Sequence, residues 1–286
     1  MIILQLIGGL GNQMFQYAFA KALFNHGYDI KLDISAFETY HLHGGFGLDH
    51  YDISIPIASK EEVAPCKMNF FTKLKRKLKI PNKKILEEKT LRFQNDLLSP
   101  PDSTYIHGYF QSEKYFKEIR ADIIQDFTLT TPLSLYSESI KEKVQGSINS
   151  ASIHIRRGDY VSNAHANNTH GTCSLAYYQQ SITLLDSKFD NIHFFIFSDD
   201  IEWVKNNLLV KNCTYIENDS SRIPHEDIYL MSLCQHNIIA NSSFSWWGAW
   251  LNTNNHKIII APKIWFKHPK MQIQTSDIVP EDWLRL

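Results

Sequence analysis

Two consecutive arginines at the end of a predicted strand are the residues of this chain whose types and spacing most clearly suggest chemistry. Residues 151–156 alternate apolar and polar side chains, the pattern of a half-buried β-strand, so His154 and Arg156 share one face. Arg157 and the turn Gly158-Asp159 then end the strand. Ligands of open α/β sheets bind beyond strand carboxyl ends, and a guanidinium can hold two phosphate oxygens at once. The segment therefore predicts an anion site or, alternatively, a solvated strand end with paired arginines.

Two further loops follow predicted strands in the same half of the chain. Residues 198–200 follow the apolar run 192–197, and residues 241–244 separate a short strand from a tryptophan-rich helix. Ser242 and Ser243 would lie at the N-terminus of that helix, where they act either as N-caps or as phosphate ligands. Because strand carboxyl ends of a parallel sheet share one edge, we expect these two loops and the arginine loop to meet in one crevice.

Acidic residues of this half could recognise the rest of a nucleotide. Asp199, Asp200 and Asp227 could accept hydrogen bonds from ribose hydroxyls or guanine N–H groups. Alternatively, each could complement the dipole at a helix N-terminus. The chain contains no Asp-x-Asp motif. We therefore expect no metal ion to bind the diphosphate, and we expect the arginines to neutralise its negative charge.

The elements that must position these loops alternate between strand and helix. The periodicity predicts strands at 152–156, 192–197, 214–216, 237–240 and 257–261, with helices at 174–186, after 200, from Pro224 to about 235, and after 243. This alternation predicts an α/β fold with a doubly wound parallel sheet. Three tryptophans of the last helix suit core packing better than sugar stacking: Trp246, Trp247 and Trp250.

The N-terminal half opens with strand 1–7, a glycine turn at 8–11, a helix from Asn12 that stops near Gly27, and strand 30–34. The turn is similar to a dinucleotide-binding βαβ unit, but the third glycine of G-x-G-x-x-G falls on Met14. A Rossmann oxidoreductase with a nicotinamide or flavin is therefore only an alternative.

Later in this half, residues 105–110 suggest another strand. The turn-rich residues 130–134 mark a boundary between domains 1–133 and 134–286, which a helix over 134–146 would bridge.

Composition limits the remaining function classes. The 286 residues suffice for two domains, and a net charge of −1 provides no general basic field for nucleic acid. No apolar run approaches the roughly 20 residues of a membrane-spanning helix, and the N-terminus lacks the basic start of a signal peptide. Four widely spaced cysteines without a C-x-x-C pair argue against disulfides and structural zinc. We therefore expect a cytoplasmic protein.

One segment has an unusual charge. Residues 67–84 hold eight basic and no acidic side chains, and four apolar residues there share a helical face: Phe70, Phe71, Leu74 and Leu78. Such a stretch suits peripheral contact with the anionic inner face of a membrane. The alternative is a solvated basic helix that folds onto the acidic remainder of the chain.

Four stretches together resemble a known family. Residues 7–17 (IGGLGNQMFQY), 108–116 (GYFQSEKYF), 154–160 (HIRRGDY) and 241–251 (NSSFSWWGAWL) are similar to motifs of the inverting α-1,2-fucosyltransferases of glycosyltransferase family 11. The resemblance implies a GT-B-like architecture, with two Rossmann-like domains facing a central cleft. The N-terminal domain would be on the acceptor side, and the C-terminal domain would bind GDP-fucose.

The resemblance also implies a reaction. L-fucose would pass from GDP-β-L-fucose to the 2-hydroxyl of a terminal galactose, without metal or cofactor, in bacterial surface polysaccharide synthesis. Because the arginine motif alone is shared more loosely with α-1,6- and protein O-fucosyltransferases, another linkage is an alternative.

The resemblance implies that Arg156 contacts the donor β-phosphate. We predict Arg156, His154 and Asp159 as catalytic, with Asp159 either the general base or the residue that orients Arg156. Related α-1,6 enzymes place a glutamate shortly after this motif, but residues 161–165 contain no carboxylate, so the base stays open. The predicted donor-binding residues are Arg157, Asp199, Asp227, Ser242, Ser243, Phe244, Gly9, Gly11, Asn12 and Gln13.

Overall fold

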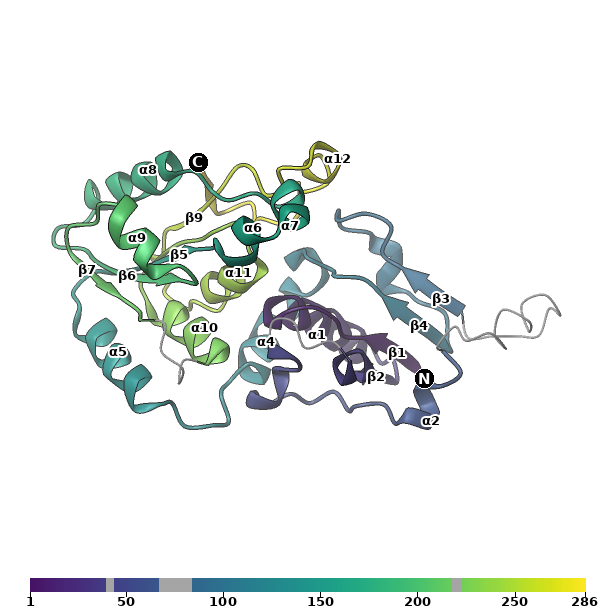
Figure 1. The fold of residues 1–286 in the computed structure, drawn as a ribbon. Helices are drawn as coiled ribbons and strands as arrows, with labels where there is room; N and C mark the ends of the chain where they lie inside the picture. Colours follow the sequence, from purple (N-terminus) through teal and green to yellow (C-terminus); the bar gives the residue numbers. More distant parts are fainter. Residues whose placement is uncertain (40–43, 67–83, 218–222) are drawn as a thin grey trace. The chain divides into compact units, whose positions relative to one another are not determined.

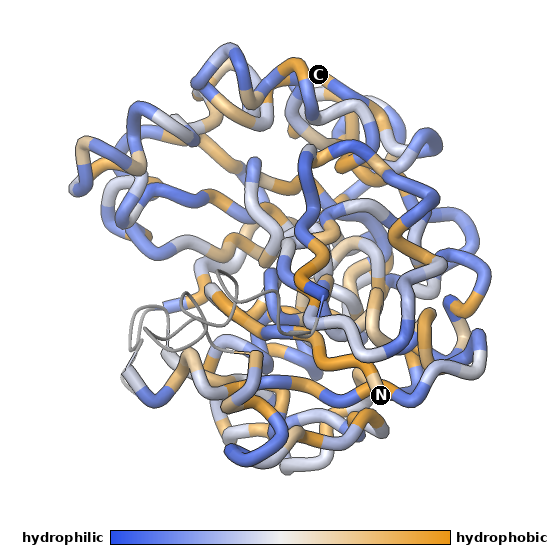
Figure 2. The backbone as a smooth tube through the Cα atoms, turned by 90° about the vertical axis from the view of Figure 1, so that its right-hand side faces the viewer, coloured by the Kyte–Doolittle hydropathy of each residue, from blue (hydrophilic) through white to orange (hydrophobic). Residues whose placement is uncertain are grey.

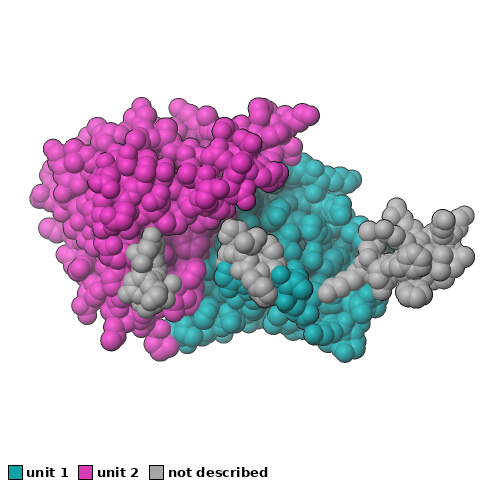
Figure 3. Space-filling view, viewed as in Figure 1, with its two compact units in different colours: residues 1–131 teal, residues 132–286 magenta. Residues whose placement is uncertain are grey.

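The computed structural model describes residues 1–39, 44–66, 84–217 and 223–286, which form two compact units. Unit 1 comprises residues 1–131 and unit 2 residues 132–286 (Figure 3). The boundary predicted from the sequence, between residues 133 and 134, lies two residues after the one in the structure. Each unit is built on its own parallel sheet (Figure 1), as the alternation of strands and helices predicts.

Unit 1 has a four-stranded sheet of order β2-β1-β4-β3 in which every pair is parallel. Its strands are β1 (Ile2–Gln5), β2 (Ile30–Asp33), β3 (Lys84–Glu87) and β4 (Thr104–His107). Its α-helices are α1 (Leu10–Asn25), α2 (Lys60–Val63) and α4 (Arg120–Asp126). The described residues of this unit also form the 3-10 turns η1 (Ser35–Glu38), η3 (Leu48–His50), η4 (Asn95–Leu98), η5 (Glu113–Tyr115) and η6 (Lys117–Ile119).

Helix α1 is buried on nearly all of its faces, so its polar side chains need internal partners. Lys21 forms an ion pair with Asp126 at 2.7 Å, and the hydroxyl of Tyr17 donates to the same carboxylate. The helix ends one residue before His26, and Gly27 follows with φ +89°, a conformation that favours glycine. The predicted stop at Gly27 is confirmed.

Unit 2 has a six-stranded parallel sheet of order β10-β9-β8-β5-β6-β7. Its strands are β5 (Ser150–Ile155), β6 (His193–Ser198), β7 (Cys213–Tyr215), β8 (His236–Ile238), β9 (Ile259–Ala261) and β10 (Leu284–Arg285). Its helices are α5 (Leu135–Gly146), α6 (Gly158–Ser162), α7 (Ala164–Thr169), α8 (Leu175–Asp186), α9 (Ile201–Asn207), α10 (Pro224–Leu233), α11 (Ser243–Trp250) and α12 (Pro269–Gln272). Helix α5, which was expected to bridge the halves, lies wholly in unit 2.

Strand β5 is buried along its whole length, so the prediction of a half-buried strand was wrong. The strand lies in the middle of its sheet, between β8 and β6, and both of its faces are covered. Its small polar side chains are satisfied internally. Ser152 accepts a hydrogen bond from the Asn237 amide at 2.8 Å, and Ser150 accepts one from the Gln235 backbone at 3.1 Å.

The tryptophans of α11 form part of the core of unit 2, as predicted. Trp246, Trp247 and Trp250 are at most 2% exposed, and the indole N–H of Trp246 donates to the Ile278 carbonyl at 2.7 Å. This burial excludes them from sugar stacking. The hydropathy colouring in Figure 2 shows that the chain begins with a hydrophobic run at the N-terminus, and this run forms β1.

No helix within the described part of the chain is long and apolar enough to span a membrane. The basic segment predicted to contact a membrane lies outside the described residues, apart from Lys84.

Candidate functional site

The sheet of unit 2 reverses its direction of strand addition between β5 and β8. From β5 the chain adds β6 and β7 on one side, and then β8, β9 and β10 on the other. Ligands of doubly wound sheets bind at the strand carboxyl ends beside such a reversal. The arginine loop follows β5, and residues 239–242 follow β8, so both predicted loops lie at this point.

Arg156 stands at the carboxyl end of β5 between two carboxylates. Its guanidinium forms ion pairs with Asp159 at 2.5 Å and with Asp199 at 2.9 Å. Asp159 lies in the first turn of α6, and Asp199 follows β6. Two partners on different elements fix the direction of the guanidinium, whose side chain is still 27% exposed. Arg156 is therefore paired, as the alternative interpretation predicts, and its side chain is also partly accessible, while the anion site stays a prediction.

Asp199 holds the arginine loop through the backbone as well. Its second oxygen accepts a hydrogen bond from the Arg157 N–H at 2.8 Å. A Cβ atom on Gly158 would lie 2.6 Å from Asp199 Oδ2, closer than real Cβ contacts allow. Glycine at position 158 therefore permits the carboxylate to lie against the loop.

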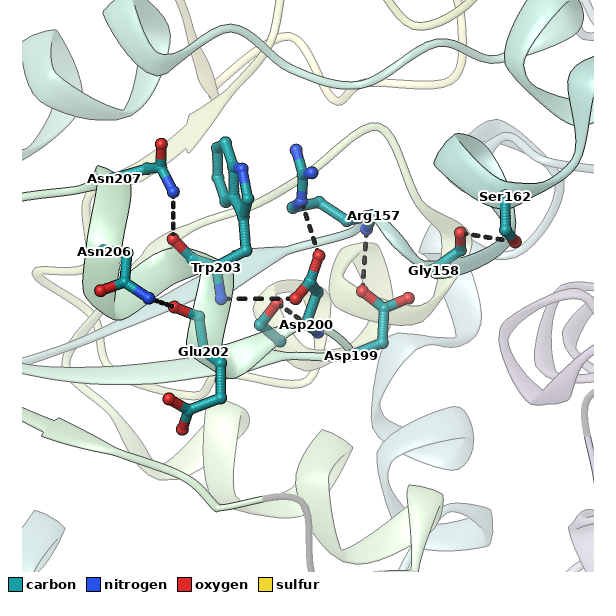
Figure 4. Close-up of polar contacts among 10 residues, drawn as sticks. Arg157, Gly158, Ser162, Asp199, Asp200, Glu202, Trp203, Asn206 and Asn207 are labelled. Atoms are coloured by element: carbon teal, nitrogen blue, oxygen red, sulfur yellow. Dashed lines mark hydrogen bonds and ion pairs between the residues drawn. The ribbon is translucent and has the colours of Figure 1, made fainter.

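Arg157 points toward α9, as Figure 4 shows. Its Nε donates to Asp200 at 3.0 Å, and its guanidinium carbon lies 3.5 Å from the centre of the Trp203 ring. Asp200 also caps α9, accepting from the Trp203 N–H at 3.3 Å. The helix-capping interpretation of Asp200 is thus confirmed. Trp203 was not predicted, because the short helix gave no reason to single out its aromatic residue.

A stack of aromatic rings lies next to Arg156. Its guanidinium carbon is 5.5 Å from the Tyr160 ring centre, Tyr160 stacks on His170 at 4.7 Å, and His170 lies 5.1 Å from Phe266. Burial raises the pKa of Tyr160 and lowers that of His170, although nearby Asp159 partly opposes the second shift. Both rings are therefore favoured in their uncharged forms. His170 was not predicted, because residues 161–171 have no periodicity that would single it out.

The third loop begins α11. Ser242 is the N-cap, with its hydroxyl accepting from the Phe244 N–H at 3.3 Å, so the capping interpretation is confirmed for this serine. Ser243 and Phe244 are half-buried. The Phe244 ring lies 5.5 Å from that of His154, which joins the third loop to β5.

Asn241 fixes the shape of this loop. Its amide group donates to the carbonyls of His170, Gly171 and Trp265 at 3.0 to 3.2 Å. The thiol of Cys173 donates to its amide oxygen at 3.4 Å, and burial raises the pKa of that thiol to about 11. Asn241 therefore holds together three chain segments beside the β5–β8 reversal.

The other predicted residues lie elsewhere. Asp227 is buried in the first turn of α10, a helix that packs against α11 and α5. Four predicted donor contacts belong to unit 1: Gly9, Gly11, Asn12 and Gln13. The buried Gln13 amide donates to the Gly8 and Gly45 carbonyls and accepts from the Gly47 N–H, at 2.8 to 3.0 Å. These hydrogen bonds indicate that the Gln13 side chain joins the loop at Gly8 to the loop at Gly45 and Gly47.

The described geometry suits recognition of an anion. Two guanidinium groups lie beside three carboxylates, and the Arg156 side chain is still 27% exposed, so an incoming diphosphate could approach its guanidinium group. Within the described ranges, no group of three or more His, Cys, Asp or Glu side chains is placed to hold a metal ion.

Two solved structures illustrate the similarity of fold. The NodZ fucosyltransferase from Bradyrhizobium aligns with 86% of this chain and 91% of its own, at a TM-score of 0.51 and 12% identity. A mutant of Arabidopsis thaliana FUT1, solved in complex with GDP, aligns with 90% of this chain and 69% of its own, at a TM-score of 0.52 and 10% identity. These likenesses concern the fold alone, and they confirm the predicted GT-B-like α/β class.

Sequence comparison is more specific. An Escherichia coli α-1,2-colitosyltransferase is 37% identical over all of this chain and 98% of its own length. The O-antigen biosynthesis glycosyltransferase WbnK of Escherichia coli is 32% identical over 98% of this chain and 99% of its own. The bovine galactoside 2-α-L-fucosyltransferase SEC1 is 27% identical over 53% of this chain and 43% of its own. Glycosyl transferase family 11 matches residues 1–286. The chain therefore belongs to glycosyl transferase family 11, and it is a glycosyltransferase.

Proposed function

We propose that this protein transfers L-fucose from GDP-β-L-fucose to the 2-hydroxyl of a terminal galactose and inverts the anomeric configuration. The observation that carries the proposal is the placement of Arg156, partly exposed and oriented by two carboxylates, at the strand reversal of unit 2. Membership of family 11 and relatives named for α-1,2 transfer support the linkage.

Arg156 would stabilise the leaving group. As the glycosidic bond to GDP breaks, negative charge grows on the β-phosphate, and preorganised donors aimed at that charge supply a large share of catalysis. A guanidinium held by Asp159 and Asp199 needs little reorganisation, because its direction is already fixed. Ser243 and the N-terminus of α11 could add N–H donors at the same reversal.

The acceptor hydroxyl would attack the anomeric carbon as GDP departs, through an oxocarbenium-like state. A single displacement converts the β-linked donor into an α-fucoside. Asp159 lies 2.5 Å from the Arg156 guanidinium, a position that favours an orienting role over that of a free general base. We propose that His154 lies against the bound donor, because its ring packs beside that of Phe244 between β5 and α11.

A second donor is a specific candidate. The colitosyltransferase relative is 37% identical over the whole chain, so a colitosyl group could take the place of fucose at the same site. The phosphate-binding chemistry of Arg156 would be the same for both sugars. The difference would lie in contacts to the sugar ring.

A donor screen tests the proposal. The purified protein is incubated with GDP-fucose, GDP-colitose and a UDP-hexose, each with a panel of galactosides, and release of GDP and UDP is measured. We expect GDP release from a GDP-linked deoxyhexose that depends on the galactoside. Release of UDP without GDP would refute the donor assignment, and preference for GDP-colitose would select the second candidate.

We place the reaction in the assembly of a bacterial surface polysaccharide at the cytoplasmic face of the membrane. The relative WbnK is named for O-antigen biosynthesis, which supports this setting. Flotation with vesicles that contain phosphatidylglycerol, for the wild type and for a variant with glutamine at the basic positions from Lys73 to Lys83, tests the membrane contact.

A further inference from the structure

Three side chains determine where the Arg156 guanidinium lies. Asp159 pairs with one of its terminal nitrogens at 2.5 Å, and Asp199 pairs with the other at 2.9 Å. The third neighbour is the ring of Tyr160, because the guanidinium carbon lies over this ring at 5.5 Å from its centre. The position of the guanidinium therefore depends on whatever holds the Tyr160 ring in place.

His170 holds the Tyr160 ring by stacking on it. The two ring centres are 4.7 Å apart, and the ring planes are nearly parallel, at 5° to each other. The His170 ring also lies 5.1 Å from that of Phe266, which is buried. Tyr160 belongs to α6, His170 follows α7 and Phe266 follows β9, so the stack joins three segments of unit 2 to the arginine.

The backbone of His170 is fixed by those segments. Its N–H donates to the Ala166 carbonyl at 2.8 Å, and its carbonyl accepts from the Lys267 N–H at 3.1 Å and from the Asn241 amide at 3.2 Å. Gly171 follows with φ +64°, and a Cβ atom there would lie 3.0 Å from Lys267 Cβ. Glycine at position 171 therefore lets this turn lie against the segment after β9.

The backbone of Tyr160 is tied to the same segments. Helices α6 and α7 pack against each other (Figure 1), and the Tyr160 carbonyl accepts from the Asn167 amide at 2.6 Å. The Asn167 amide oxygen in turn accepts from Lys267 Nζ at 3.0 Å. The rings of Tyr160 and His170 are therefore brought together by two backbones that are themselves held in place.

The charges around His170 decide whether its ring is protonated. Burial lowers the pKa of His170, Asp159 raises it, and Arg156 and His165 lower it. The segment after β9, which packs against His170 through Phe266, adds the basic side chains of Lys267 and His268.

The uncharged ring is compatible with the observed stack. A protonated ring would bring a second positive charge to the side chain of Tyr160, over which the Arg156 guanidinium already lies. Repulsion between the two cations would therefore disfavour the arrangement in which Tyr160 contacts both groups.

We propose that His170 is a positioning residue for the transfer reaction: its uncharged ring holds Tyr160 against the Arg156 guanidinium, and protonation of His170 releases both. The proposal rests on the role of Arg156 in the proposed function. It goes further in assigning a residue that acts on the guanidinium through a second side chain and that makes the reaction sensitive to acidic pH.

The first test is kinetic, at neutral pH with GDP-fucose and lactose. His170→Ala should lower kcat about two- to tenfold, the value for loss of a stacked aromatic pair. The KM for GDP-fucose should stay within about twofold of wild type, since the positioned guanidinium acts mainly on charge that develops in the transition state. His170→Phe, which keeps an uncharged ring, should restore most of kcat.

His256→Ala, at an exposed position of the same unit, is the matched control and should behave as wild type. Thermal unfolding of each variant shows whether its fold survives. A folded His170→Ala protein with the kcat of this control would overturn the proposal, and so would a larger effect on the KM for GDP-fucose than on kcat.

The second test is the pH profile of kcat. In wild type, kcat should fall as His170 is protonated, which happens below the ordinary histidine range because burial lowers its pKa. In His170→Phe this fall should be absent or should move to lower pH, whereas His256→Phe should keep the wild-type profile. Identical acid limbs in wild type and His170→Phe would contradict the role given to the charge of His170.

A measurement without donor separates this inference from the proposed function. NMR follows the His170 ring and the Arg156 Nε–H signal, identified by its loss in Arg156→Lys, while calorimetry measures GDP binding. The Arg156 signal should shift with the midpoint of His170 in wild type and lose that shift in His170→Phe. Coupled signals in a protein that binds no GDP would refute the donor assignment and leave the coupling intact. Independent titration of the two signals would overturn the inference even if fucose transfer is confirmed.

Discussion

Gly158 and Asp199 are in such close contact that an added Cβ atom on the glycine would lie 2.6 Å from the carboxylate oxygen. The same carboxylate pairs with Arg156 and accepts from the Arg157 N–H. The position of Arg156 at the strand reversal therefore depends on the absence of a side chain at position 158.

Gly158→Ala should lower activity by displacing Asp199 from Arg156. Overpacking of this kind costs about 1–3 kcal/mol, which corresponds to roughly a 5- to 150-fold loss if it falls on the transition state. Turnover and thermal unfolding measure the two effects. Gly146→Ala is the control, because a Cβ atom at the end of α5 meets no atom within 4 Å and alanine favours the helix. Equal activity of the two variants would remove the Gly158–Asp199 contact from the account.

Arg156→Ala should reduce turnover by about 10² to 10⁴ while the fold survives, because two charge-assisted hydrogen bonds to the leaving phosphate are lost. Arg156→Lys should not restore the rate, since an ammonium group cannot reproduce the planar fork. Steady-state kinetics and thermal unfolding check this, with the exposed Lys211→Ala as the charge control. Near-normal turnover by folded Arg156→Ala protein would contradict the role assigned to the guanidinium.

Gln16→Leu should destabilise unit 1 without touching unit 2. It leaves the Ile7 N–H and the Gly108 carbonyl without the amide that now pairs with them, at about 1–3 kcal/mol for each buried group. Chemical denaturation followed by fluorescence measures the loss. Gln125→Leu, at an exposed position of α4 in the same unit, is the matched control. A loss no larger than that of the control would show that the Gln16 amide is not needed to hold the loops at Ile7 and Gly108.

Stability should fall on acidification as His236 is protonated. Burial lowers the pKa of His236 to about 4, and its Nδ1 accepts from the Ile258 N–H at 3.0 Å, which requires an unprotonated nitrogen. An unfolded histidine titrates near about 6.5, so the contribution is complete above that pH and is lost as pH falls from about 6.5 toward 4. The expected loss is about 3 kcal/mol.

Denaturation midpoints across this pH range, for wild type and His236→Gln, measure the effect. The variant should show a flatter pH dependence, whereas His26→Gln, at an exposed position, should behave as wild type. Parallel curves for wild type and His236→Gln would contradict the assignment of the acid loss to His236.

The arginine site could be predicted from sequence to the level of its loops. Strands β6 and β8 are apolar runs and β5 shows an alternating pattern, and parallel topology then places the residues that follow these strands at one edge. The individual contacts could not be predicted. The pairing of Arg156 with Asp199 and the stacking of Tyr160 on His170 depend on exact registers between segments that local periodicity does not encode.

Two features of the fold, strand β3 and the full burial of β5, could not be predicted from the sequence, and each failure has a physical reason. Strand β3 is a short edge strand with mostly exposed side chains, so residues 84–87 show no apolar pattern. Strand β5 alternates isoleucine with serine and histidine, which suggested that one face of the strand is exposed to solvent. Small polar side chains can be buried when an internal partner is present, and Asn237 provides one for Ser152.

The most direct test of the central claim is the structure of the product formed without metal. The protein is incubated with GDP-fucose, lactose and an excess of EDTA, and the product is analysed by NMR. The account predicts an undiminished rate and a single α-linked fucose whose anomeric proton correlates with carbon 2 of galactose. A β-linked fucose, a different galactose carbon, or a rate that disappears with EDTA and returns with magnesium or manganese would contradict it.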